Sequence, residues 1–129
     1  MKISELATKT RVPAKTIRYY ETAGLLSAPV RGANGYRYYA SEDIDTLVFI
    51  RRCRELNIPL EEIKQLVAAQ RNPEASCDTI DNIIAEQLAR VRQTRQELAQ
   101  LEHTLAMLAT SCSNKQIQHC AILQRLKAD

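Results

Sequence analysis

One long helical stretch, from about Asp78 to Ala109, most constrains what this chain can fold into. No Gly or Pro interrupts the stretch, and good helix formers fill its outer face. Its apolar residues recur at heptad spacing, which predicts a coiled-coil seam against a partner helix. One row of this seam is Ile84, Val91, Leu98 and Leu105, and the interleaved row is Ile80, Gln87, Thr94, Leu101 and Leu108.

Cysteines flank the predicted helix on both sides. Cys77 lies just before it, and Cys112 and Cys120 lie beyond it. A helix of this length spans about 45 Å, so one chain cannot bring the three thiols together. An antiparallel homodimer through the seam would place Cys77 of the partner subunit beside Cys112 and Cys120. The spacing therefore predicts two identical three-thiol sites in each dimer.

Charge is distributed unevenly along the 129 residues. This length leaves room for one domain, or for a small domain plus a helical arm. The net charge is +3, but residues 1–37 hold seven Lys and Arg against two Glu, which favours a polyanionic partner. No apolar run is long enough to cross a bilayer and no signal peptide is evident. We therefore expect a cytoplasmic protein with no membrane contact. Cytoplasmic thiols stay reduced, which favours metal binding or catalysis over disulfides.

Two short helices joined by a tight turn are predicted at the amino end, over about Ile3–Thr10 and Pro13–Ala23. Ser4 is available to cap the first helix, and Gly24 is suited to end the second. The second helix would turn Ile17 and part of Tyr20 inward, and Lys15, Thr16, Arg18 and Tyr19 outward. A basic outward face on the second helix favours a helix-turn-helix that binds DNA, although a solvated basic helix is the alternative.

A basic hairpin is predicted directly after these helices. Asn34-Gly35 is the strongest short hairpin signal, and the aromatic run that follows it favours a strand. A basic hairpin after a helix-turn-helix is typical of a DNA-binding wing. Arg31 and Arg37 can reach phosphates, and Tyr36 or Tyr38 can pack or donate a hydrogen bond.

The string Thr16-Ile-Arg-Tyr-Tyr-Glu21, followed by Gly24-Leu-Leu26 and Asn34-Gly-Tyr-Arg37, resembles the winged-helix domain of the MerR family of bacterial transcription regulators. Residues 49–56 and 60–64 continue the resemblance without a gap, and it covers essentially the whole chain. Pro13 is a local departure, because a small polar capping residue is expected there.

The resemblance implies a mainly α protein with three parts. These are a winged helix-turn-helix head (residues 1–72), an antiparallel coiled-coil dimerisation helix (73–110), and a metal-binding loop with a short carboxyl-terminal helix (111–129). A helix capped by Ser41 and running to about Leu56, with a second over about Leu60–Ala69, would form a second wing. Cys53 inside that pair is predicted to be a small buried hydrophobic residue. The expected DNA-binding residues are Lys15, Thr16, Arg18, Tyr19, Arg31, Asn34, Gly35, Tyr36, Arg37, Arg52 and Arg54.

The choice of metal rests on the thiols, which select soft or borderline ions. Copper and silver sensors of the family carry Ser where this chain has Cys77, so the resemblance implies a divalent ion. The chain most resembles the cadmium- and lead-responsive branch, with Zn(II), Hg(II) or Cu(I) as alternatives. His119 could complete a four-coordinate site, or it could be an exposed loop residue.

The resemblance implies a regulator rather than an enzyme. Such a dimer binds a palindromic promoter, and metal binding distorts the DNA so that RNA polymerase can engage genes of metal resistance or efflux. A thiol redox regulator is the alternative from another class. An iron–sulfur version would need four closely spaced cysteines near the carboxyl end, where this chain has two.

Overall fold

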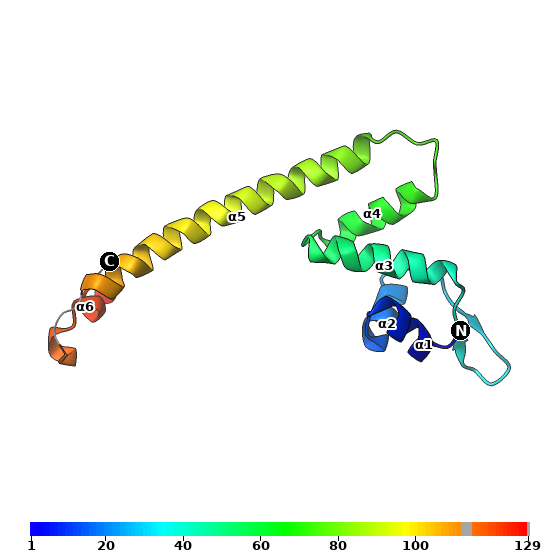
Figure 1. The fold of residues 1–129 in the computed structure, drawn as a ribbon, viewed down its shortest axis with the longest axis horizontal. Helices are drawn as coiled ribbons and strands as arrows, with labels where there is room; N and C mark the ends of the chain where they lie inside the picture. Colours follow the sequence, from blue (N-terminus) through cyan, green and yellow to red (C-terminus); the bar gives the residue numbers. More distant parts are fainter. Residues whose placement is uncertain (112–114, 129) are drawn as a thin grey trace. The chain divides into compact units, whose positions relative to one another are not determined.

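A computed structural model describes residues 1–111 and 115–128 of the chain (Figure 1). The chain is mainly helical, as expected, and divides into two compact units, Met1–Gln87 and Leu88–Asp129. Within the ranges described, no helix is both long enough and apolar enough to cross a membrane. The elements in chain order are α1 (Ile3–Thr10), α2 (Ala14–Thr22), β1 (Val30–Arg31), β2 (Arg37–Tyr38), α3 (Glu42–Glu55), α4 (Leu60–Gln70), α5 (Asp78–Ser111), the short 3-10 helix η1 (Ile117–His119) and α6 (Ala121–Lys127).

The first unit has one hydrophobic core, to which every helix from α1 to α5 contributes. α1 packs against α2 and α3, and α3 packs against α4. Fully burying one aliphatic side chain contributes about 1.5–3 kcal/mol, so these few contacts dominate the stability of a unit of this size. The aliphatic residues at its centre are Leu6, Ile17, Leu47, Ile50, Ile58 and Ile63.

The turn between α1 and α2 is tight and partly strained. The Thr10 hydroxyl is buried and donates to the Leu6 carbonyl at 2.8 Å, while Val12 is buried. Between them Arg11 takes a left-handed conformation, with φ of 57°. An L-residue with a side chain pays about 1–2 kcal/mol for that conformation. Asn57, in the connection between α3 and α4, has a similar φ of 60°.

α2 ends as the sequence predicts. Gly24 has φ of 82°, its amide donates to the Glu21 carbonyl, and the Leu25 amide donates to the Tyr20 carbonyl. These two bonds form a Schellman motif, which satisfies carbonyls at the helix end and favours glycine in the left-handed position. The chain then leaves α2 toward the hairpin.

The hairpin predicted from Asn34-Gly35 is present. Val30 pairs with Tyr38 and Arg31 with Arg37 in an antiparallel register. In the turn Gly35 has φ of 81°, and the Asn34 side chain accepts a bond from the Tyr36 amide at 3.1 Å.

The base of the hairpin is fixed to the amino end of the chain. The Tyr39 amide donates to the Met1 carbonyl at 2.8 Å, next to the start of α1. The wing is therefore attached to the helix-turn-helix at its base and open at its tip.

Two capping predictions are wrong. Ser4 lies inside α1, where its carbonyl accepts a bond from Thr8, and the residue before the helix is Lys2, which makes no side-chain cap. Ser41 precedes α3 but its hydroxyl makes no capping bond. The Asp43 carboxylate instead accepts a hydrogen bond from the Ala40 amide at 3.0 Å. A carboxylate in the first turn of a helix is also favoured by the helix dipole.

The beginning of α5 belongs to the first unit. Ile83 is buried in the core, and Ile80 packs against it. Gln87, a polar member of the predicted seam, is buried too, and its side-chain amide donates to the Leu56 carbonyl at 2.8 Å. A polar side chain is favoured at position 87 because it satisfies the Leu56 carbonyl, which lies at the end of α3 and has no hydrogen-bond partner within that helix.

Apolar residues on the rest of α5 are exposed in the single chain. Their exposed fractions lie between 46% and 60%, which is unusual for a whole row of large aliphatic residues. They include five of the predicted seam residues, together with Leu88, which the heptad pattern did not include. The exposed row is Ile84, Leu88, Val91, Leu98, Leu101 and Leu105.

We expect Arg11→Gly to raise the free energy of unfolding by about 0.5–1 kcal/mol, because glycine removes the left-handed strain but costs more backbone entropy on folding. Urea denaturation of the isolated protein measures the change. Asn57→Gly is the comparison, and its gain should be smaller because asparagine tolerates this conformation better than arginine. A loss of stability in Arg11→Gly would show that the Arg11 side chain makes a stabilising contact.

Candidate nucleic-acid interface and thiol sites

α2 separates its side chains into a buried and an exposed face. Ile17 and Tyr20 are buried, whereas Lys15, Arg18 and Tyr19 are exposed, as the sequence predicts. Thr16, also expected on the outer face, is half-buried. The exposed face can therefore offer a cation, a guanidinium and a phenol to a ligand while the opposite face anchors the helix.

Glu21 connects α2 to the wing. Its carboxylate accepts a hydrogen bond from the Tyr39 hydroxyl and lies 3.6 Å from Arg37 Nε. Burial raises the pKa of the Tyr39 phenol, and the hydrogen bond to Glu21 raises it further. Tyr39 therefore stays neutral as a donor, and the carboxylate stays close to the Arg37 guanidinium.

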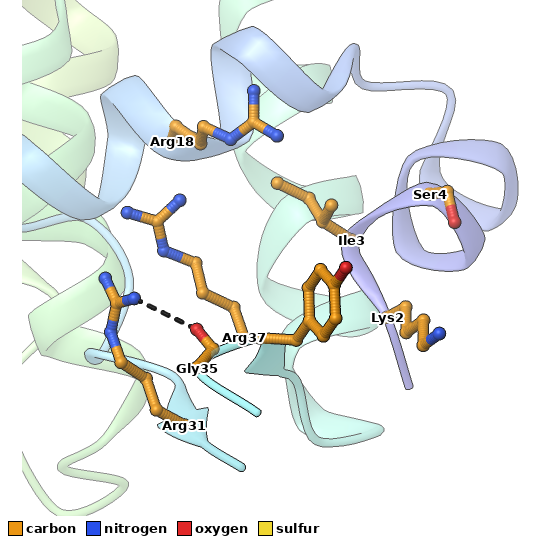
Figure 2. Close-up of a pocket in the computed structure, with 8 residues that line it drawn as sticks. Lys2, Ile3, Ser4, Arg18, Arg31, Gly35 and Arg37 are labelled. Carbon is orange, nitrogen blue, oxygen red and sulfur yellow. Dashed lines mark hydrogen bonds between the residues drawn. The ribbon is translucent and has the colours of Figure 1, made fainter. Parts of the chain in front are cut away.

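Basic side chains from three segments line a pocket of about 330 Å³, which we call the basic pocket (Figure 2). Lys2 comes from the residues before α1, Arg18 from α2, and Arg31 and Arg37 from the two strands of the wing. Arg31 donates to the Gly35 carbonyl across the hairpin at 3.2 Å. Three of these residues were predicted from the sequence as separate DNA contacts, and the structure brings them to one place.

The wing tip presents Tyr36, whose side chain is 62% exposed. The Lys2 ammonium lies 5.5 Å from the centre of the Tyr36 ring, a cation–π distance. Sequence reasoning missed Lys2, although a lysine directly before an amphipathic helix was an available signal. It also missed Glu21 and Tyr39, whose pairing depends on tertiary structure.

The expected contacts on α3 lie elsewhere on the first unit. Arg52 is exposed, and Arg54 donates to the Ile58 carbonyl at 3.0 Å. The Arg54 guanidinium thus has a structural role at the end of α3, and its other N–H groups remain available. Neither arginine lines the basic pocket, and neither does Lys15.

The cysteines differ in surroundings. Cys53 is buried in the core, and burial raises the pKa of its thiol, which agrees with the predicted structural role. Cys77 is exposed directly before α5, and Cys120 is half-buried directly before α6. His119 is exposed in η1. Cys112 lies outside the described residues.

Cysteine sulfur is the donor that soft and borderline ions prefer, so Cys77 and Cys120 fit such an ion in their chemistry. Each leaves part of its side chain accessible. Among residues 1–111 and 115–128 of a single chain, no three potential ligands gather into a metal site. The residues that separate Cys77 from Cys120 in the sequence include all 34 residues of α5.

An exposed basic helix in a helix-turn-helix, with a basic wing beside it, defines a winged-helix DNA-binding protein. Residues 1–70 match the model of MerR HTH family regulatory proteins, and residues 44–108 match the model described as MerR, DNA binding. The chain belongs to the MerR family of transcription regulators, which are not enzymes.

Similar proteins cover nearly the full chain. The HTH-type transcriptional regulator HmrR of Rhizobium leguminosarum bv. viciae is 36% identical over 126 residues, which are 98% of this chain and 97% of that protein. The regulator PbrR691 of Ralstonia metallidurans CH34, solved in complex with lead(II), is 36% identical with a TM-score of 0.89, and 98% of each chain is covered. MerR of Bacillus megaterium MB1, solved with a mercury(II) ion, is 31% identical with a TM-score of 0.74, covering 99% of this chain and 100% of that one.

We expect Tyr39→Phe to lower the free energy of unfolding by about 1.5–3 kcal/mol, because it removes a hydrogen bond to a carboxylate and leaves that carboxylate without its donor. Tyr38→Phe is the matched control. The Tyr38 hydroxyl only accepts a long 3.5 Å bond from exposed Asn34, so the loss should be below about 0.5 kcal/mol. Equal losses in the two variants, measured by urea denaturation, would contradict the role assigned to Glu21.

Proposed function

We propose that this protein is a homodimeric, metal-responsive transcription regulator that binds a divalent soft ion, Cd(II) or Pb(II), through thiols of both subunits. The main support for this proposal is the sequence around α5, which has a cysteine before the helix, cysteines after it, and an exposed apolar row along it. The proposed parts are a DNA-binding head (1–72), a dimerisation helix (73–110) and a metal-binding end (111–129).

The exposed apolar row supports the dimer. A helix with a long apolar stripe in water lowers its free energy by pairing with a second helix, and an identical chain offers a complementary stripe. The 34 residues of α5 correspond to about 50 Å. Antiparallel pairing would therefore bring Cys77 of the partner subunit toward Cys112 and Cys120 of this chain.

The thiols support a soft divalent ion. Cys112 and Cys120 would hold it from one subunit, Cys77 from the other, and His119 is a candidate fourth ligand. The bound ion would supply a cross-link between the subunits. Two relatives solved with lead(II) and mercury(II), which are 36% and 31% identical to this chain, support a soft divalent ion as the ligand.

The head supports promoter binding. Two heads related by dimer symmetry match the halves of a palindromic site. The DNA-facing groups are Lys15, Thr16, Arg18 and Tyr19 on α2, Arg31 and Asn34-Gly-Tyr-Arg37 on the wing, and Arg52 and Arg54 on α3. A change in head orientation on metal binding would distort the promoter so that RNA polymerase can engage it, using DNA deformation as the switch. The regulated genes would serve metal resistance or efflux, and a protein acting on promoters would work in the cytoplasm.

We expect Cys77→Ser to weaken Cd(II) and Pb(II) binding by the reduced dimer more than about 100-fold. Cys77 is a proposed direct ligand, and losing even a residue that only hydrogen-bonds to a metal ligand lowers metal affinity by about 10–100-fold. A competitive titration followed by thiolate-to-metal absorption measures the affinity. Cys53→Ala is the control, because the Cys53 thiol is buried in the core and is not one of the proposed ligands, so this variant should bind metal as the parent does.

The same titration decides between ions. If Cys77→Ser binds as tightly as the parent and Cu(I) outcompetes the divalent ions, the protein is a monovalent-ion sensor.

Cys112→Ser should abolish the transcriptional response to metal and leave operator binding intact. Loss of both would indicate misfolding.

We expect Arg18→Ala to weaken operator binding by about 1–3 kcal/mol without changing the number of metal ions bound per dimer, because Arg18 is exposed on α2 and far in sequence from the thiols. Fluorescence anisotropy at fixed salt measures the affinity. Unchanged affinity would remove Arg18 from the DNA-binding surface.

A further inference from the structure

We propose that Arg11, in the turn between α1 and α2, binds a phosphate of the DNA, and that this contact explains an arginine at a position that favours glycine. Arg11 lies outside the DNA contacts expected on α2, the wing and α3. The proposal rests on the proposed function for the operator. A phosphate contact carries no base sequence information, so it can be measured on any duplex.

The backbone conformation of Arg11 is the first argument. Its φ of 57° lies in the left-handed region, where an L side chain is disfavoured. Arg11 is also the capping residue at the end of α1, next to the helix end where glycine or asparagine usually takes this conformation. Strained residues other than glycine gather at functional sites. The arginine side chain therefore needs a role that offsets the strain.

The neighbours of Arg11 impose this conformation. Thr10 is buried, and its hydroxyl donates to the Leu6 carbonyl at 2.8 Å. Val12, on the other side, is buried in the core. Arg11 itself is exposed between these two buried residues. The core thus fixes the backbone of the turn and leaves the side chain of residue 11 in solvent, whichever residue stands there.

The exposed guanidinium has no partner within the protein. Arg11 makes no side-chain hydrogen bond, ion pair or ring contact with any residue in 1–111 or 115–128. Glu5, the one acidic residue of α1, pairs with Lys9 at 3.2 Å instead. A cation near the end of α1 is favoured by the helix dipole, but Lys9 already supplies one in the last turn. A partner outside the chain is the remaining role for the charge of Arg11.

The place of the turn indicates a DNA phosphate as this partner. In helix-turn-helix proteins the first helix crosses the DNA backbone and the second lies in the major groove. The turn between the two helices therefore passes the edge of the groove, where the phosphates lie. Lys15, near the start of α2, is exposed too, and no acidic residue in the first turn of α2 would repel a phosphate. Arg11 would bind a phosphate beside the groove that α2 enters.

The test compares three substitutions at position 11 in the full chain. Arg11→Gly removes the charge and the strain, Arg11→Asn removes the charge with a residue that tolerates the conformation, and Arg11→Lys keeps the charge. Each phosphate contact contributes about 0.9 to the slope of log affinity against log salt. Loss of one contact in each half-site should lower the slope by about two. A rise from about 50 to about 200 mM salt should then cost the parent about tenfold more affinity than it costs Arg11→Gly or Arg11→Asn.

Stability separates this role from a structural one. Arg11→Gly should unfold at a higher urea concentration than the parent and yet bind DNA more weakly, whereas a purely structural arginine would leave the salt slope unchanged. Arg92→Gln is the matched control for charge. Arg92 is exposed on α5, outside the first unit and off the predicted seam, so its loss should keep the slope of the parent.

Affinities are measured by fluorescence anisotropy on the operator and on a duplex of unrelated sequence. If Arg11→Gly and Arg11→Asn keep the slope of the parent, Arg11 binds no phosphate and the proposal is overturned. An equal loss of slope in Arg11→Lys also overturns it, because a cation at this position would not be what the DNA contacts. If the parent shows no preference for the operator, the proposed function fails, and the slopes on the unrelated duplex still decide whether Arg11 binds a phosphate.

Discussion

The carboxylate of Glu21 accepts the Tyr39 hydroxyl and lies beside Arg37, so one residue of α2 determines where the wing stands. A two-stranded hairpin of this size is marginal in water by itself. Its position therefore depends on attachments at its base, of which the Glu21 contacts and the Tyr39–Met1 backbone bond are the clearest. Recognition helix and wing consequently act as one preorganised surface, which lowers the entropy cost of binding an extended ligand.

The apolar row on α5 sets a second requirement. The first unit has a complete core, but beyond Gln87 the long helix leaves large aliphatic residues in contact with water. In the proposed dimer, the head would be stable by itself, whereas the exposed row would be buried only on association, so folding and association would be coupled. A ligand that joined the two subunits across that interface would add to the free energy that holds the dimer, so a small ion could influence the whole assembly.

Sequence reasoning predicted the helices closely because their signals are local: heptad spacing for α5, Asn34-Gly35 for the hairpin, and Gly24 for the end of α2. It failed where a residue's partner is distant or where several local candidates compete. Ser4 and Ser41 were equally plausible caps by type, yet neither caps a helix. The burial of Gln87 against Leu56 depends on how α5 begins, and the gathering of Arg18, Arg31 and Arg37 depends on the tertiary fold.

The anchoring of Gln87 has a mechanical consequence. Its side chain bonds to the carbonyl of Leu56 at the end of α3, and Ile83, one turn earlier, is buried in the core. Two anchors one turn apart resist rolling of the helix about its own axis as well as tilting. A small rotation of α5 about its own axis, imposed farther along the helix, would therefore rotate the head as well. The resulting displacement of the wing would be larger the farther the wing lies from the axis of α5.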